Sequence, residues 1–283
     1  MKKYVMLIPQ GGFNDCLSVI FRTIEYCKQY NRKLLLIMTS SVYKINFGDY
    51  FGINNPIIIY DESLIKNMVS KKKYTVYPNS LNNKLIDVLD NNIGLKYKTG
   101  GVYSYNNIFL SLPSNIVNED IIIHSRCGGG NGFELFKQLS FKDNVKDFCN
   151  QKLALLKNKK YLCIQVRNTD HKCDYKDLYN KNIKLIHSFN NIYIATDDIT
   201  VIDYFKSKYL NIYNFNIFPE GQESHNLHSA DIPPDLKIKC LICDILIATN
   251  SSELLSNSKG GFITLIRRCF LNKKFILNKL KRD

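Results

Sequence analysis

Short runs of residues that are apolar at almost every position recur along this chain, and most end abruptly at glycine or polar residues. Strands with one solvated face alternate apolar and polar residues, whereas strands of parallel sheets are buried on both faces and are apolar throughout. The sequence therefore predicts an α/β protein with parallel sheets covered by helices. The runs expected to form strands are residues 4–8, 33–38, 55–61, 120–125, 161–166 and 192–196.

The strands fall into two series, which indicates two domains. Residues 16–30, with apolar side chains at helical spacing, join the first two strands. A helix over 142–157 ends in "KNKK", after which a second strand–helix series begins. We expect two Rossmann-like domains, 1–157 and 158–283, facing a central cleft, with ligands at the carboxyl ends of the strands. The further elements expected in the second series are helices at 177–189, 200–209, 236–241 and 252–257 and strands at 210–215 and 244–248.

The chain is strongly basic, with a net charge of +14 from 39 Lys and Arg against 25 Asp and Glu. This balance favours anionic partners such as phosphate-bearing small molecules or an acidic membrane face. No zinc-finger spacing, ribonucleoprotein motif or basic helix marks a nucleic-acid module, so we expect no nucleic-acid partner. Basic residues gather near the C-terminus, where they are placed to contact anionic lipid: Lys273, Lys274, Lys279, Lys281 and Arg282.

The cysteines indicate a reducing compartment, because nine cannot form a complete set of disulfides. Cys240 and Cys243 form a lone CxxC pair, for which a buried role is favoured over zinc or redox chemistry. The five apolar residues before Pro9 are too few for a signal-peptide core, and no run approaches the ~20 residues of a membrane span. We therefore expect a cytoplasmic protein, with peripheral membrane contact through its basic C-terminus.

Polar clusters directly follow the expected strands. Gly11 and Gly12, with Asn14 and Asp15, follow the first, where a glycine turn can bring backbone N–H groups to an anion or simply cap a helix. Arg167 opens "RNTD" after strand 161–166, and its guanidinium is placed to clamp phosphate oxygens or to pair with Asp170.

Two further clusters lie in the second half of the chain. Thr249, Asn250, Ser251 and Ser252 are expected at a helix start, a natural phosphate seat that a simple N-cap would also explain. In "ATDD" (195–198), a helix cap is favoured over a metal-binding acidic pair. The long loop 218–235 carries His225 and His228 among acids, but this spacing is weak evidence for zinc and no metal is expected.

Four motifs together resemble those of the GDP-fucose-dependent fucosyltransferases. "GGFNDCL" with "NRKLLLI" is similar to the family's "GGxGNQL…NRPLxL", and "VRNTD" to its HxRRxD phosphate motif. "IYIATDD" resembles "xYxATDD", and "DLKIKCLICDILIATNSSELL" resembles the closing "D-x8-D-xLVxTxSS" segment. The motifs follow the family's order over most of the chain.

The resemblance implies an inverting, metal-independent glycosyltransferase of the GT-B type. The C-terminal domain would hold the nucleotide-sugar, with a GDP-sugar and fucose favoured, and the N-terminal domain the glycan acceptor, lipid-linked acceptors included. Arg167 would hold the β-phosphate, Asp235 would accept from the guanine edge after a one-residue gap, and Ser251 and Ser252, with Thr249, would bind phosphate. Residues 11–15 would face donor and acceptor.

Gln165 departs from the family, which has a histidine there that helps to recognise the donor. Other donors, such as UDP-xylose or GDP-rhamnose, therefore stay open, as does a noncatalytic glycan- or nucleotide-binding protein. An inverting transfer also needs a base for the acceptor hydroxyl. Asp174 is the first candidate, with Asp170, Asp15 and His124 as competitors. His124 precedes "SRCGGGNGF" and either lines the acceptor site or bonds a backbone carbonyl.

Overall fold

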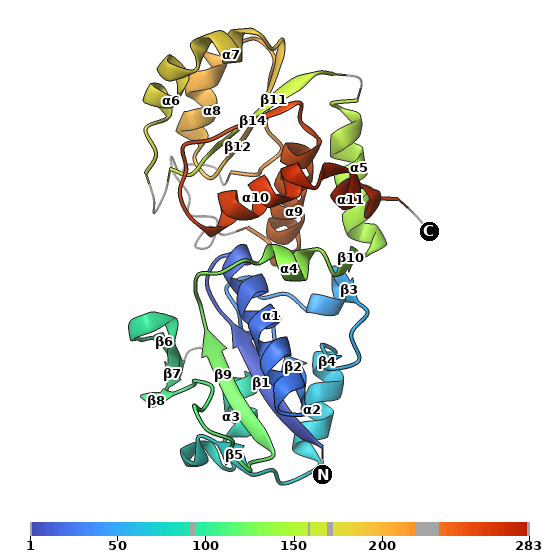
Figure 1. Cartoon of the computed structure of the whole chain (residues 1–283), viewed down its shortest axis with the longest axis vertical. Helices are drawn as coiled ribbons and strands as arrows, with labels where there is room; N and C mark the ends of the chain where they lie inside the picture. The colour runs from blue at the N-terminus through green and yellow to red at the C-terminus, as the bar shows by residue number, and fades with distance from the viewer. Residues whose placement is uncertain (1, 91–93, 158, 169–171, 219–231, 282–283) are drawn as a thin grey trace. The chain divides into compact units, whose positions relative to one another are not determined.

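The apolar runs of the first half form a parallel sheet in the computed structural model, which describes residues 2–90, 94–157, 159–168, 172–218 and 232–281. Five strands pair in the order β4-β2-β1-β9-β5 (Figure 1). The strands and helices of this part are β1 Lys3–Pro9, α1 Phe13–Gln29, β2 Arg32–Leu36, β3 Phe51–Ile53, β4 Ile58–Ile59, α2 Glu62–Ser70, β5 Val76–Tyr77, α3 Leu85–Asp90, β6 Leu95–Tyr97, β7 Tyr103–Tyr105, β8 Ile108–Phe109, β9 Ile121–Arg126, α4 Phe133–Phe136 and β10 Leu139–Phe141. Short 3₁₀ turns are η1 Phe47–Asp49, η2 Asn79–Leu81 and η4 Thr99–Gly101.

Helices cover both faces of this sheet. Met6 and Ile8 of β1 pack in one cluster with residues of α2 and α3, among them Ile65 and Val88. Val5 and Leu7 are equally buried, and successive strand residues point to opposite faces, so they lie on the face that α1 covers. Burial of both faces is the reason that these strands are apolar throughout.

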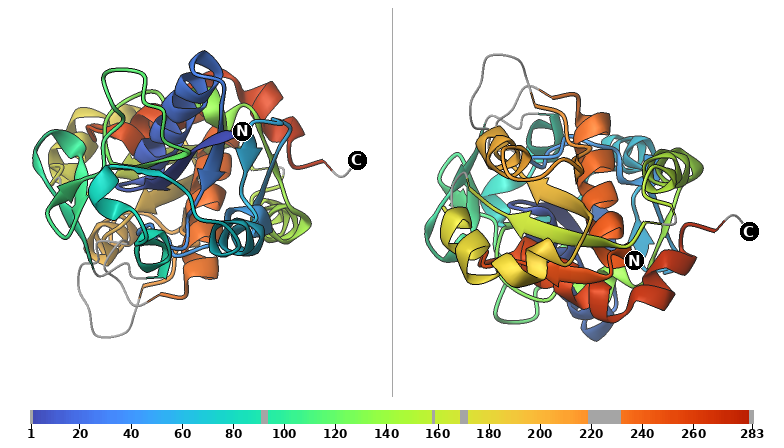
Figure 2. Two further views of the ribbon diagram at one scale, coloured as in Figure 1. Left: turned by 90° about the horizontal axis from the view of Figure 1, so that it is seen from below. Right: turned by 90° about the horizontal axis from the view of Figure 1, so that it is seen from above.

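A second parallel sheet has the order β13-β12-β11-β14. Its unit contains α5 Asp143–Ala154, β11 Tyr161–Val166, α6 Tyr175–Lys181, α7 Ile183–His187, β12 Asn191–Thr196, α8 Ile199–Lys206, β13 Ile212–Tyr213, α9 Pro234–Asn250, β14 Glu253–Leu255, α10 Gly261–Leu271 and α11 Lys273–Asn278. Leu162, Ile164 and Val166 pack with α6, α7 and α8. The helix α9 lies on the opposite face of the sheet (Figure 2). Tyr161 and Tyr193 lie on that face, and their hydroxyls donate to Ile247 and Asp244 of α9.

Two sequence predictions in this unit are wrong. Residues 244–248 were expected as a strand, but they continue the helix that was correctly expected at 236–241, within the single helix α9. Residues 252–257 were expected as a helix, but Glu253–Leu255 is strand β14, paired with β11. Most side chains of α9 between residues 237 and 249 are buried, so its pattern has no polar face that would distinguish a helix from a strand.

The chain divides into two compact units, Met1–Ser140 and Phe141–Asp283. This division falls before the boundary expected after residue 157, because α5 packs against α9 of the second unit. None of the described helices is long and apolar enough to span a membrane.

A buried carboxyl group fixes α9 to the second sheet. Asp244 of α9 accepts hydrogen bonds from the Tyr193 hydroxyl and from the Asn216 amide, the latter at 2.8 Å. The Asn216 amide also donates to the Thr196 carbonyl at 3.1 Å, at the end of β12. Burial raises the pKa of Asp244 to about 6, although both hydrogen bonds oppose the rise.

The folded protein should therefore lose stability as the pH rises through the window from 3.8 to about 6, because native Asp244 holds its proton longer than the unfolded chain does. The loss due to this group amounts to about 3 kcal/mol at most, from ~1.4 kcal/mol per pKa unit. Asp244→Asn should remove this pH dependence, measured as the free energy of unfolding in urea at pH 4, 5 and 6.5. Asp203→Asn, at an exposed position of α8, is the control and should keep the wild-type slope.

Candidate functional site

The candidate site lies at the carboxyl edge of the second sheet. β11 is central, between β12 and β14, and all three strands are parallel. The residues that follow them, Arg167 after β11, Asp197 after β12 and Ser256 after β14, therefore emerge at one edge. Ligands of open parallel sheets bind outside this edge.

The segment Ser256–Gly260 leads from β14 into the start of α10. Gly260 is the N-cap of α10, and no side chain caps this helix. The first N–H groups of an α-helix lack intrahelical acceptors, and the helix dipole adds partial positive charge there. The start of α10 is thus suited to bind an anion such as a phosphate.

Arg167 lies beside this helix start. Its backbone N–H donates to the Ser258 hydroxyl at 2.9 Å. A Cβ atom built on Gly260 would lie 3.7 Å from Nη1 of Arg167, which places the guanidinium next to the N-cap. Gly260 has φ +115°, a conformation that L side chains rarely adopt, so glycine is required at this point.

Two other predicted site residues surround the same loop. Gln165, which is buried, accepts a hydrogen bond from the Ser256 hydroxyl at 2.8 Å. Asp174 is exposed, and its Oδ1 accepts from the Asp177 N–H at 2.8 Å as the N-cap of α6. The Asp174 carbonyl accepts from the Asn257 amide at 2.9 Å, which ties the start of α6 to the loop after β14.

The acids after β12 serve as caps and anchors. Asp198 accepts from the Thr200 N–H at 2.8 Å and is the N-cap of α8, which confirms the helix-cap interpretation of "ATDD". The backbone N–H of Asn168 donates to Asp197 at 2.8 Å, and its side-chain amide donates to Asp198 at 2.7 Å. These bonds fix the backbone directly after Arg167.

The helix start expected at Thr249, Ser251 and Ser252 is wrong. These residues lie at the C-terminal end of α9, where the helix dipole is negative. Thr249 and Ser251 are fully buried, with their hydroxyls bonded to the carbonyls of Ile245 and Ala248.

Their position in the sheet also separates them from Arg167. The Ser252 N–H donates to the carbonyl of Tyr161, the first residue of β11, whereas Arg167 follows the last one. At ~3.3 Å per strand residue the two edges are about 20 Å apart. Lys273 satisfies the exposed end of α9 by donating to the carbonyls of Asn250 and Ser251, both at 2.7 Å.

Sequence reasoning missed Ser256, Ser258 and Gly260. Their signal was "SNSKGGF" immediately before the last amphipathic helix, the same combination of glycine and small polar residues that singled out Gly11 and Gly12. Asp235, predicted to meet the base, is exposed in the first turn of α9 and pairs with Lys239 at 2.9 Å. Asp170, His225 and His228 lie outside the described residues.

The glycine turn of the first unit, Gly11 and Gly12, packs against the glycine-rich loop 127–132 that follows β9. Gly11 has φ +87°, and a Cβ there would meet that of Cys127 at 2.9 Å. Gly12 is the N-cap of α1. Asn14 is buried and clamps the loop: its amide donates to the Gly130 carbonyl at 3.0 Å, and its Oδ1 accepts from the Gly132 N–H at 3.1 Å. Asn14, predicted to bind the donor, therefore has a structural role.

His124 does not fit the role of a base. It is 4% exposed, and its Nδ1 faces the Leu110 carbonyl at 3.0 Å, so Nδ1 carries the proton. Burial lowers the pKa of His124 to about 4, and the charges of Arg126 and Arg22 act in the same direction. The carbonyl-bonding alternative for His124 is thus confirmed. Asp15 lies half-buried in the first turn of α1, close to Gly11 and Cys127.

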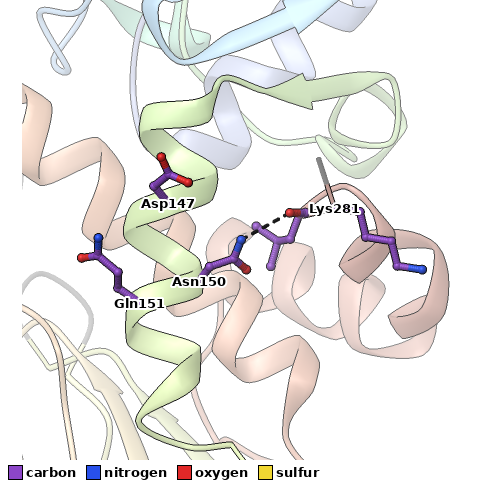
Figure 3. Close-up of a pocket in the computed structure, with 5 residues that line it drawn as sticks. Asp147, Asn150, Gln151 and Lys281 are labelled. Carbon is purple, nitrogen blue, oxygen red and sulfur yellow. Dashed lines mark hydrogen bonds between the residues drawn. The ribbon is translucent and has the colours of Figure 1, made fainter. Parts of the chain in front are cut away.

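A pocket elsewhere in the second unit is not part of this site. It lies between α5 and the C-terminal segment and is lined by Asp147, Asn150, Gln151, Leu280 and Lys281 (Figure 3). Its one drawn hydrogen bond runs from the Asn150 amide to the Leu280 carbonyl at 3.3 Å. Its lining residues lie on α5 and after α11, and none of them follows the carboxyl end of a strand, where the candidate site lies. Within the described ranges, no cluster of three or more His, Cys, Asp or Glu is arranged to hold a metal, and none of the nine cysteines forms a disulfide.

The first unit should become less stable as the pH falls from 6.5 toward 4, because unfolded His124 binds a proton that the buried ring does not. The penalty due to this group reaches about 3 kcal/mol, from ~1.4 kcal/mol per pKa unit. His124→Gln should flatten this part of the stability profile, measured by urea unfolding at pH 4.5 and 7. The same change at His187, exposed on α7, should leave the profile unaltered.

Comparison with protein families and with curated protein sequences gave no match. Solved structures do match in fold. The NodZ α-1,6-fucosyltransferase soaked with GDP-fucose is 13% identical, with a TM-score of 0.60 over 94% of this chain and 92% of that one. NodZ from Bradyrhizobium is 12% identical, with a TM-score of 0.59 over 94% of this chain and 93% of that one. POFUT1 in complex with GDP-fucose is 10% identical, with a TM-score of 0.56 over 95% of this chain and 94% of that one. The chain thus has the GT-B fold of these fucosyltransferases.

Proposed function

We propose that this protein is an inverting glycosyltransferase that moves a sugar, with fucose favoured, from a nucleotide diphosphate to a glycan acceptor. One observation carries the proposal: the Arg167 guanidinium lies beside the uncapped start of α10, at the carboxyl edge of a parallel sheet. That combination suits a diphosphate, since a guanidinium binds phosphate oxygens as a fork and the helix start supplies N–H donors. The fold shared with fucosyltransferases crystallised with GDP-fucose supports the same assignment.

Arg167 would act by stabilising the leaving diphosphate. As the bond between the sugar and the diphosphate breaks, negative charge grows on the leaving phosphate oxygens. Fixed positive groups aimed at that charge lower the barrier, and they need no rearrangement during the reaction. Arg167 and α10 supply such groups from the protein itself, so we propose a transfer without a required metal.

Asp174 is the proposed base for the acceptor hydroxyl. It lies next to the loop after β14, and its carboxylate is exposed. Oδ1 is engaged in capping α6, whereas Oδ2 has no hydrogen bond within the described residues, which leaves it able to accept a proton. Asp15 and Asp170 stay as alternatives, whereas buried His124 is not retained.

The base of the nucleotide and the sugar are proposed on the resemblance alone. Asp235 is exposed, as a contact with a guanine edge would require, and Gln165 stands where the family has histidine. Because Gln165 already bonds Ser256, its contribution to the donor would come through the phosphate loop. Another donor, such as UDP-xylose or GDP-rhamnose, or a noncatalytic binding protein with the same fold, is the alternative.

Arg167→Ala should weaken the binding of GDP about 10- to 100-fold, as expected for the loss of a charged hydrogen bond of about 1.5–3 kcal/mol. Calorimetry in EDTA with GDP, UDP, CDP and ADP measures this loss and the preference for the base. Arg268→Ala, at an exposed position of α10, is the matched control and should bind like the wild type. Thermal unfolding of both variants checks that the fold is intact.

The results separate the alternatives. Selective binding of GDP supports a GDP-sugar donor, and binding of UDP instead would discard fucose and keep the transfer chemistry. Nucleotide binding without sugar transfer, under a panel of GDP-sugars and glycans, would favour the noncatalytic protein. If no nucleotide binds with or without manganese, the donor site is wrong.

We also propose that the C-terminal helices contact an acidic membrane face, where lipid-linked acceptors lie. Leu271, the last residue of α10, is 77% exposed, and Phe275 of α11 is 52% exposed. Cations surround them: Arg267, Arg268 and Lys274 are exposed, and the Lys279 ammonium lies 4.9 Å from the ring of Phe275. Exposed apolar side chains ringed by cations suit the boundary between anionic headgroups and acyl chains.

The double variant Leu271→Ser/Phe275→Ser should bind vesicles that contain phosphatidylglycerol several-fold more weakly than the wild type does, because apolar insertion is lost. Cosedimentation with these vesicles and with phosphatidylcholine vesicles measures the difference. Leu64→Ser, at a 52% exposed position of α2, should have no effect. Equal binding of wild type and double variant would contradict the contact.

A further inference from the structure

Two arginines of the first unit flank its glycine loop. Arg22, on α1, donates from Nη2 to the Gly128 carbonyl at 2.8 Å. Arg126, the last residue of β9, donates from Nη2 to the Gly100 carbonyl at 3.2 Å. Arg22 reaches the loop after β9, whereas Arg126 reaches η4. The two segments are joined where the Cys127 N–H donates to the Gly101 carbonyl at 2.8 Å, at the carboxyl edge of the first sheet.

These two cations are close enough for the charge of one to act on the other. Arg126 contributes to lowering the pKa of Arg22, after burial, while Asp15 acts in the opposite direction. Both arginines also lower the pKa of His124. Salt bridges are formed elsewhere in the described part of the chain, but none of them involves Arg22 or Arg126. Like charges held together in this way favour an anion between them.

Arg32, in the same unit, has a structural role, and its hydrogen bonds can be compared with those of Arg22 and Arg126. Its guanidinium is buried and donates to three backbone carbonyls, those of Tyr4, Val117 and Glu119, at 2.6–3.3 Å. Arg22 and Arg126 each make one such bond, and Nε of Arg126 is buried without a partner in the described structure. With five N–H donors on each guanidinium, most of their capacity is left over for a ligand.

Aromatic side chains continue the surface beside the arginines. Tyr103 of β7 lies next to Cys127, and burial raises the pKa of Tyr103 to about 12, so its hydroxyl stays protonated at neutral pH. Tyr97 of β6 packs edge-to-face on Tyr103 with ring centroids 5.7 Å apart, and it is 60% exposed. Such rings offer an apolar face and a polar hydroxyl, the combination that packs against a sugar ring.

We propose that Arg22 and Arg126, with Tyr103 beside them, form a binding site for an acidic glycan, in which the guanidinium groups hold a carboxylate or phosphate group on the sugar. This inference rests on the proposed function in one respect, namely that the glycan is the acceptor of the transfer. Arginine suits the task because its planar fork binds both oxygens of such a group.

Calorimetry on the full chain tests the site with three probes: a hyaluronan tetrasaccharide, which carries carboxylates, N-acetylglucosamine 1-phosphate, and neutral chitotetraose. The expected result is binding of an anionic probe that weakens with added salt, together with no binding of chitotetraose. The probe that binds identifies the group as carboxylate or phosphate. Arg22→Ala should reduce this binding at least 10-fold and leave GDP binding unchanged. Arg126→Gln should do the same, and Lys28→Ala, at an exposed position of α1, should change neither.

The outcomes distinguish this site from the donor site. If GDP binds and the anionic probes do not, or if they bind no more tightly than chitotetraose, the inference is overturned while the proposed donor site stands. It is also overturned if Arg22→Ala, which alters an exposed side chain and should fold normally, binds the probe like the wild type. Binding that depends on the arginines in a chain that binds no nucleotide would support an acidic-glycan site and refute the transferase.

Discussion

The parallel pairing of β11 with both β12 and β14 is the constraint on which the candidate site depends. Parallel strands place all their carboxyl ends at one edge, so the residues that leave those ends are brought together although they are far apart in sequence. β11 is buried at every position, and a charged group can appear only where the strand ends. Arg167 is that first position, which explains the abrupt change from apolar to polar residues.

Hydrogen bonds then turn this edge into a fixed arrangement. Ser258 bonds the backbone of Arg167, Gln165 bonds Ser256, and Asp197 and Asp198 hold Asn168. Each bond connects the end of one strand with the segment after its neighbour. A phosphate would therefore meet donors that are already in position, and little conformational freedom would be lost on binding.

The sequence was informative where burial decides the local pattern. Strands buried on both faces, the helix expected at 16–30 and found at Phe13–Gln29, and the position of Arg167 could all be predicted, because each follows from local apolar periodicity. The prediction failed at α9, whose burial on all sides removes that periodicity. The same error placed the phosphate seat at Ser251 and Ser252, one strand length from the edge where Arg167 lies. The loop Ser256–Gly260 was missed because strand β14 has only three residues and two of them are only partly buried.

The two units share a glycine turn between a strand and a helix, but different residues lie beside it. In each, a glycine follows a strand and begins a helix, and Gly12 and Gly260 are both N-caps without a side-chain cap. In the first unit the glycine turn packs against Cys127, and the cations beside it come from Arg22 and Arg126. In the second unit Arg167 stands at the helix start, and Arg267 of α10 donates to the Ser256 carbonyl at 3.0 Å.

Hydrogen exchange of the backbone amides with and without GDP reports where the nucleotide binds. We expect slower exchange in the presence of GDP for residues 256–264 and for Arg167 and Asn168. Residues 249–252, at the opposite edge of the sheet, should exchange at an unchanged rate. Protection of 249–252 without protection of 256–264 would place the phosphates at the end of α9 and contradict a donor site at the start of α10.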